Sequence, residues 1–98
     1  MLQHVVLWKF ADEAKEENMA RVRAELLALK GVVPESREIH VGRDMAHTAA
    51  SYDLMLRACF DSYADMQSYQ VHPAHVAVAD FVRGGGAVAD EFIFKIVK

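Results

Sequence analysis

The sequence predicts an α+β fold, in which a four-stranded antiparallel sheet carries helices on one face. Three observations support this. Its 98 residues suit one domain with one modest core. Four separate runs are rich in β-branched and aromatic residues, as strands are. The segments between the first and second runs, and between the third and fourth, have helical character.

The first run, residues 4–10, is expected to be a strand. Val6, Trp8 and Phe10 alternate with Val5 and Leu7. Both faces are therefore apolar, and such a strand must be covered on both sides.

The next segment, residues 12–30, is expected to be a helix. Its buried stripe consists of Met19, Val22, Leu26 and Leu29, at spacings of three and four residues. Asp12 is the expected N-cap, and Gly31 is the expected residue just after the C-terminus.

The remaining elements follow the same patterns. We expect residues 38–41 to form a short strand that ends at Gly42. We expect residues 52–60 to form the third strand, with its even-numbered residues on one apolar face. A helix over residues 62–70 has Asp61 or Ser62 as its cap. Pro73 starts a second helical piece that runs to about residue 83 and ends at three glycines. Residues 91–97 form the last strand.

This order is strand, helix, strand, strand, helix, strand, which is the ferredoxin-like βαββαβ pattern. Its helices cover one face of the sheet, and the other face is open in a single chain. The residues expected on the open face are Val5, Leu7, Met55, Cys59, Ile93 and Val97. Because a large exposed apolar surface indicates an interface, we expect two copies to pack sheet to sheet as a homodimer.

Composition excludes several partners and compartments. The net charge is −3, from 14 acidic and 11 basic residues, so no basic surface for nucleic acid or a membrane is expected. No apolar run is long enough to span a bilayer, and the start has no basic region or cleavage site typical of a leader. Cys59 is the single cysteine, so no internal disulfide can form. These features predict a cytoplasmic protein.

The segment 69–75 holds the candidate chemistry, because it places a phenol and two imidazoles at a break between helices. His75 would lie in the first turn of the new helix, where the helix dipole favours a neutral imidazole. Together with the Tyr69 hydroxyl it could polarise a carbonyl group and move a proton without a cofactor. Tyr69 could equally be a core aromatic residue, and His72 fits a capping role better than a ligand role.

Two further histidine hypotheses are weaker. His72 and His75 have a spacing that suits a metal, but no nearby carboxylate or thiolate completes a ligand set, so no metal is expected. His4 lies on the strand face that meets the helices, where a core role competes with a role in the site.

Three stretches of the chain resemble the stress-responsive A/B-barrel (Dabb) family. They are residues 4–10, residues 32–34 with 41–44, and residues 52–62 with 69–76, the last containing Tyr69-Gln70-Val71-His72-Pro73-Ala74-His75-Val76. The resemblance extends over almost the whole chain, as one domain over residues 1–98. It implies a dimeric α+β barrel built from ferredoxin-like protomers.

The resemblance also implies candidate site residues. One plant member is a polyketide cyclase that closes a ring by aldol condensation without a cofactor, and its catalytic tyrosine and histidine match Tyr69 and His75. His4 would lie near the same cavity. The residues expected to contact a substrate are His4, Val6, Trp8, Val22, Leu26, Leu54 and Leu56. Leu26 and Leu54 replace an aromatic residue and a histidine of that cyclase, and Trp8 replaces an aliphatic residue and could fill the cavity.

The functional expectation is therefore a protein that binds a small apolar carbonyl compound between sheet and helices. The alternatives are a cofactor-independent cyclase with His75 as general base and, with less support, a cofactorless monooxygenase.

Overall fold

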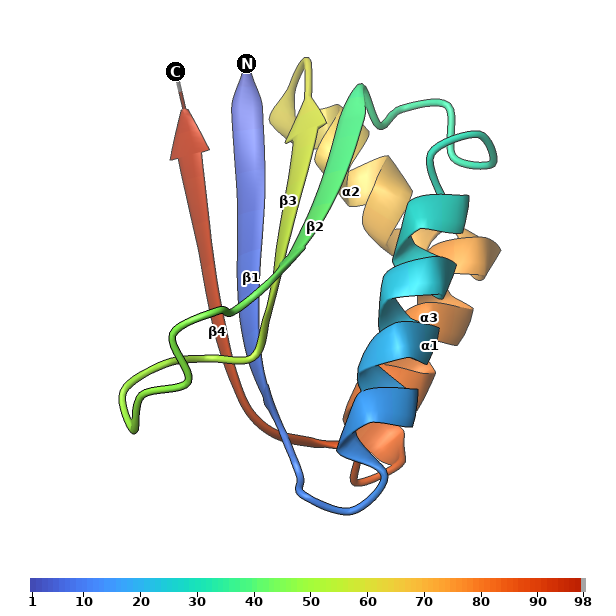
Figure 1. Cartoon of the computed structure of the whole chain (residues 1–98). Helices are drawn as coiled ribbons and strands as arrows, with labels where there is room; N and C mark the ends of the chain where they lie inside the picture. Colours follow the sequence, from blue (N-terminus) through green and yellow to red (C-terminus); the bar gives the residue numbers. More distant parts are fainter. Residues whose placement is uncertain (98) are drawn as a thin grey trace.

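The computed structural model describes residues 1–97; Lys98, the last residue of the expected domain, lies outside them. The described elements are β1 (Leu2–Phe10), α1 (Lys15–Ala28), β2 (Glu38–Arg43), β3 (Leu54–Phe60), α2 (Tyr63–Val71), α3 (Pro73–Gly84) and β4 (Val88–Val97). The strands form one antiparallel sheet in the order β2-β3-β1-β4. All three helices of this range lie on the same face of the sheet (Figure 1). The predicted ferredoxin-like α+β fold is confirmed.

The core lies between the sheet and the helices. Alternate residues of the two central strands point into it, among them Val6 and Phe10 of β1 and Leu56 of β3. From α1, Met19 and Val22 meet them, and Val22 is completely buried. The alternation predicted for β1 and β3 therefore sets which residues form the core.

The faces of β4 are the reverse of the expectation. Phe92, Phe94 and Ile96 lie on the open face, because Phe94 pairs with Val5 and Phe92 with Leu7. Ile93 and Val97, expected on the open face, lie on the helix side instead. Both sets are apolar, so hydropathy alone did not distinguish them; the register with β1 decides.

The ends of α1 also differ from the expectation. The helix begins at Lys15, and its N-cap is Ala14 in a left-handed conformation (φ 53°), not Asp12. Residues 12–14 instead form the turn that reverses the chain after β1. At the other end the C-cap is Leu29, so Gly31 is not the residue just after the helix, contrary to the expectation. The chain continues in turns, in which the amides of Val32 and Val33 donate to the Leu29 carbonyl.

Four strand boundaries differ from the expectation. β2 continues through Gly42 to Arg43, because β3 pairs alongside it. β1 and β4 begin at Leu2 and Val88, each earlier than expected. β3 begins at Leu54, not residue 52.

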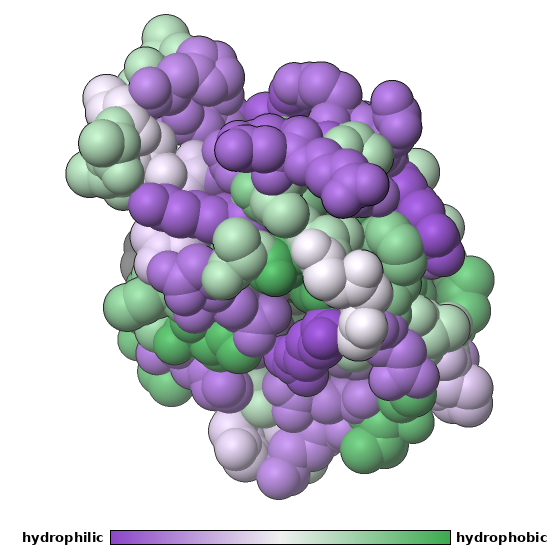
Figure 2. All heavy atoms as spheres, turned by 90° about the horizontal axis from the view of Figure 1, so that it is seen from below, coloured by the Kyte–Doolittle hydropathy of each residue, from purple (hydrophilic) through white to green (hydrophobic). Residues whose placement is uncertain are grey.

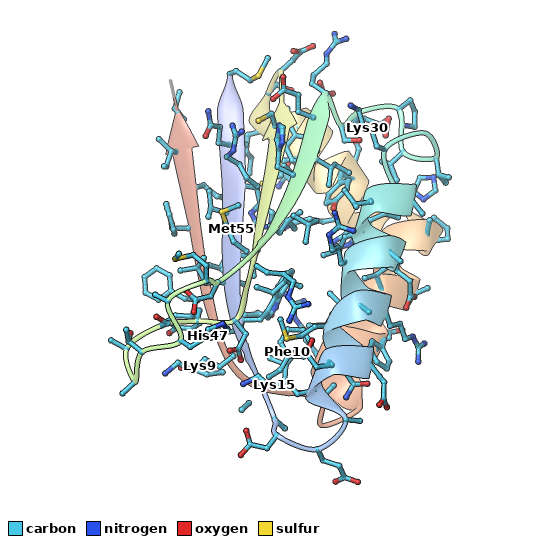
Figure 3. All side chains as sticks on the ribbon, viewed as in Figure 1. Lys9, Phe10, Lys15, Lys30, His47 and Met55 are labelled. Atoms are coloured by element: carbon cyan, nitrogen blue, oxygen red, sulfur yellow. The ribbon has the colours of Figure 1, made fainter. Side chains whose placement is uncertain are left out.

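The loop before β3 is held by polar contacts. The Asp53 carboxylate accepts the Phe10 amide at 2.8 Å and pairs with the Lys15 ammonium at 3.2 Å. Lys9 donates to the Ala49 carbonyl. In Figure 3, Lys9, Lys15 and His47 lie together at this end, while Phe10 points between sheet and helices. The side chain of Asp53 therefore holds the loop, while its backbone bonds to Trp8 of β1 and to Asp44 after β2.

Charge and hydropathy are distributed unevenly over the surface. Seen from below, the end formed by the β1–α1 and α3–β4 connections is mostly hydrophilic, with hydrophobic side chains visible between the polar ones (Figure 2). Among residues 1–97 no helix has the length and apolar character needed to cross a bilayer.

Candidate functional site

The break between α2 and α3 positions the predicted site residues. Ser62 caps α2, and its hydroxyl accepts the Asp65 amide at 3.1 Å. The helix stops at His72, which is extended because it precedes Pro73. The His72 Nδ1 atom then accepts the Ala74 amide at 3.1 Å and caps α3. The predicted capping roles of Ser62 and His72, and Pro73 at the first position of a helix, are confirmed.

The His75 imidazole is fixed by a carbonyl that the break leaves free. Its Nδ1 atom lies 3.0 Å from the Gln70 carbonyl oxygen. A carbonyl can only accept, so Nδ1 carries the hydrogen and, in the neutral ring, Nε2 has the free lone pair. Burial lowers the pKa of His75, an effect that outweighs the opposing influence of the Gln70 carbonyl. His75 is therefore a neutral ring at pH 7 with a basic Nε2.

Tyr69 packs beside this ring. The centroids of Tyr69 and His75 are 4.5 Å apart, and the planes are inclined by 50°. On its other side Tyr69 contacts Phe60, with centroids 5.0 Å apart. The Tyr69 side chain is completely buried, and its hydroxyl has no hydrogen-bond partner within residues 1–97. Burial raises the pKa of Tyr69, so the phenol stays protonated at neutral pH.

His4 is buried on the helix side of β1. Its side chain is 5% exposed, and Nδ1 is without a hydrogen-bond partner in the described part of the chain. Burial, followed by the charge of Lys95, lowers the pKa of His4 to about 4. His4 is thus uncharged at pH 7 and has unused hydrogen-bonding capacity.

A cavity of about 370 Å³ lies between the sheet and the helices. Its lining residues are His4, Val6, Trp8, Leu26, Leu56, Gln70, His75, Val76, Val78, Ala79, Asp80, Val82, Arg83 and Glu91. Trp8 forms part of the wall and leaves this volume open. The two neutral imidazoles therefore share one cavity with apolar side chains and with the charged groups of Asp80, Arg83 and Glu91.

The predicted site residues separate into two groups. His75, His4, Val6, Trp8, Leu26 and Leu56 line the cavity. Tyr69, Val22 and Leu54 are buried in the core and are not among the lining residues. Tyr69 nevertheless reaches the site through its contact with His75.

Sequence reasoning missed a charged group in this cavity. The Trp8 indole Nε1 donates to Glu91 Oε2 at 2.7 Å, and Arg83 Nη2 lies 3.4 Å from Glu91 Oε1. Glu91 lies opposite Trp8 in the β1–β4 register. A glutamate at an inward position of an apolar strand is a recognisable signal, but only once that register is known.

Metal binding has no support in the geometry. Across residues 1–97, no group of three or more histidine, cysteine, aspartate or glutamate side chains is arranged to hold an ion.

Comparison with known proteins identifies the family. Residues 2–87 match the stress responsive A/B barrel domain. The chain belongs to this family. The resemblance seen in the sequence is therefore confirmed.

The individual proteins that are similar to this chain have diverse descriptions. Olivetolic acid cyclase from Cannabis sativa is 26% identical over 84 residues, which are 84% of this chain and 83% of that protein. A dimeric protein of unknown function with a ferredoxin-like fold from Bacteroides fragilis has a TM-score of 0.88 and 25% identity, and the match covers 99% of this chain and 95% of that one. Hydroxynitrile lyase from Passiflora edulis has a TM-score of 0.85 at 16% identity, covering 99% and 92%. The last likeness concerns the fold alone.

Proposed function

We propose that this A/B barrel protein binds a small, mostly apolar carbonyl compound in the cavity between sheet and helices. The observation that carries the proposal is the placement of His75. Its Nδ1–H is bonded to Gln70, so its basic Nε2 is left for other contacts, and the ring lines a cavity of about 370 Å³. That volume falls within the range of small-molecule sites, roughly 300–1,000 Å³.

The charge state of the cavity supports a neutral ligand. Burial lowers the pKa values of both His4 and His75, so neither imidazole attracts an anion at pH 7. Val6, Leu26 and Leu56 supply apolar walls. A neutral molecule with one or two polar groups matches this lining better than a phosphate or a dicarboxylate.

A second candidate function is cofactor-independent catalysis of the cyclase type. The contact between Tyr69 and His75 and the similarity to olivetolic acid cyclase favour it. In such a reaction His75 Nε2 takes a proton from the carbon next to the carbonyl, and the phenol donates a hydrogen bond to the enolate oxygen. The Tyr69 hydroxyl must reach the cavity for this, and it is fully buried here. Binding is for that reason the primary proposal.

The proposed assembly is a homodimer through the open sheet face, in the cytoplasm. Phe92 and Phe94 are 52% and 38% exposed on that face, and Ile96 is 36% exposed. The similar Bacteroides fragilis structure is described as dimeric. Burial of such a surface against a second copy removes these side chains from water.

Acetophenone in D2O provides a test of both functions. Nuclear magnetic resonance (NMR) titration measures binding through the shifts of the cavity residues, and loss of the methyl proton signal measures proton abstraction. The wild type is expected to bind, and His75→Gln to bind more weakly. If the site also catalyses proton transfer, exchange exceeds the protein-free rate and falls by about 100-fold in His75→Gln.

The matched control is His47→Gln, because His47 is an exposed histidine of the β2–β3 loop, outside both the cavity and the open sheet face. It should behave as the wild type in both measurements. Binding that is identical in the wild type and in His75→Gln would contradict the assignment of the site.

A further inference from the structure

We propose that Glu91 is a specificity-determining residue of the cavity, which selects carbonyl compounds that carry a neutral hydroxyl group and rejects carboxylates. The inference rests on the proposed function, because it names the class of ligand for that same cavity. It starts from the contacts of Trp8, Glu91 and Arg83.

Glu91 is held in place by a buried donor. Trp8 is 4% exposed, so its indole N–H needs an acceptor inside the protein. Glu91 Oε2 supplies it at 2.7 Å. Movement of the carboxylate away from the cavity would leave that N–H unpaired, which costs free energy. The position of Glu91 is therefore set before any ligand arrives.

The carboxylate keeps capacity to accept another hydrogen bond. Its two oxygens offer about four lone-pair sites. One is taken by Trp8, and the contact of Oε1 with Arg83 is long, at 3.4 Å. The Glu91 side chain is 22% exposed and lines the same cavity as His75. A hydroxyl group of a bound molecule can donate to the remaining sites.

The neighbouring charges disfavour an anionic ligand. A ligand carboxylate would meet Glu91 and Asp80, which both line the cavity, against the single guanidinium of Arg83. A neutral donor avoids this repulsion and can still donate a hydrogen bond to Glu91, so a phenol or an enol matches this end of the cavity.

Three matched probes test the inference. They are 4′-hydroxyacetophenone, which donates a hydrogen bond; 4′-methoxyacetophenone, which cannot; and 4-acetylbenzoate, which is anionic. Trp8 is the single tryptophan, so its indole N–H gives one identifiable NMR signal at the proposed contact. Dissociation constants are measured from that signal and from His75.

The wild type is expected to bind the hydroxyl probe about tenfold more tightly than the methoxy probe, as one hydrogen bond to a charged acceptor implies, and the anionic probe least. Glu91→Leu should remove the preference for the hydroxyl. Glu91→Gln keeps an acceptor and the side-chain shape but loses the charge, so it should bind 4-acetylbenzoate more tightly than the wild type does. Asp90→Asn is the control, because Asp90 is the adjacent strand residue and is not in the lining; it should leave the order unchanged.

The outcomes separate this inference from the proposed function. If the three probes bind the wild type and both Glu91 variants in the same order, Glu91 has no role in selection although the cavity binds carbonyl compounds. If no probe perturbs Trp8 or His75 in the wild type, both proposals are wrong.

Discussion

His75 and Tyr69 are in direct ring contact, with centroids 4.5 Å apart, but only His75 lines the cavity. The tyrosine lies behind the histidine, between it and Phe60. In this structure the Tyr69 hydroxyl is not in the cavity lining, so a ligand in the cavity would contact His75 and not Tyr69. Tyr69 can therefore stabilise the fold through its ring without contributing its hydroxyl to chemistry in the cavity.

Replacement of Tyr69 by phenylalanine tests this separation of ring and hydroxyl. The hydroxyl is buried without a partner among the described residues, so its removal relieves an unsatisfied polar group. We expect the free energy of unfolding to stay equal or rise by up to about 1 kcal/mol. Tyr69→Ala should instead cost about 3–5 kcal/mol, because the aromatic ring fills the core. Urea unfolding measures both.

The same variant separates the two candidate functions. If binding of acetophenone is the activity, Tyr69→Phe binds as the wild type does. A loss of proton exchange in Tyr69→Phe with unchanged binding would show that the hydroxyl reaches the ligand. If Tyr69→Phe instead lost more than about 1 kcal/mol of unfolding free energy, the hydroxyl would have a hydrogen-bond partner, contrary to the structure.

Acid should destabilise the protein through His4. Its pKa is about 4 in the folded protein and 6.5 ordinarily, so the unfolded chain binds the proton more readily. This contribution is fully present above pH 6.5 and is lost as the pH falls towards 4, with roughly 3 kcal/mol as its upper bound. His4→Leu should therefore lose less stability between pH 7.5 and pH 4.5 than the wild type.

Urea unfolding at both pH values and at one protein concentration checks this prediction. His47→Gln is the control, because His47 is exposed and its short contact with Asp44 is made by its backbone amide, which the substitution retains; it should retain the wild-type pH dependence. An unchanged pH dependence in His4→Leu would mean that His4 is not held neutral by the fold.

Substitution on the open sheet face should separate the proposed dimer. Phe94 lies on that face opposite Val5. Phe94→Lys places a charge in the interface, and we expect dimer affinity to fall at least about tenfold. Sedimentation equilibrium should give twice the 11.0 kDa chain mass for the wild type and approach one chain mass for the variant.

Val97→Lys is the matched control for the interface. Val97 is an exposed apolar residue of the same strand, but it lies on the helix side of the sheet. It should remain dimeric. A monomeric wild type, or a dimer that both variants leave intact, would contradict the proposed interface.

The cap of α2 gives a local test of how the site is held. The Ser62 hydroxyl accepts the Asp65 amide at the start of the helix that carries Tyr69. Ser62→Ala should lower the free energy of unfolding by about 1 kcal/mol. Ser68→Ala changes an exposed serine inside the same helix and should cost nothing, since alanine favours helix. Equal effects of the two changes would show that the cap contributes little.

Local signals in the sequence predicted much of the fold. The stripe on α1 and the alternation on β3 each identify the face that enters the core, although Cys59 on the other face of β3 is also buried. Pro73 fixed the break between α2 and α3, because proline restricts the residue before it. Residues close together along the chain, such as Tyr69 and His75, could therefore be placed side by side from the sequence.

The wrong predictions concern features that are determined by residues far apart in the sequence. β4 is apolar on both faces, and only its pairing with β1 shows that Phe94 is on the open face and Glu91 is inside. The bond between Trp8 and Glu91 joins residues 83 positions apart, which no local pattern encodes. Likewise, Asp12 has the chemistry of a cap, but the turn after β1 moves the start of the helix to Lys15.

Both proposals require a neutral His75 that carries its proton on Nδ1 and presents Nε2 to a ligand in the cavity. ¹⁵N NMR of the histidine rings at pH 7, without and with 4′-hydroxyacetophenone, tests this requirement. We expect His75 to be the Nδ1–H tautomer with a pKa below 6.5, and its Nε2 resonance to move when the compound is added. A proton on Nε2, or a ring that the compound leaves unperturbed, would contradict this requirement.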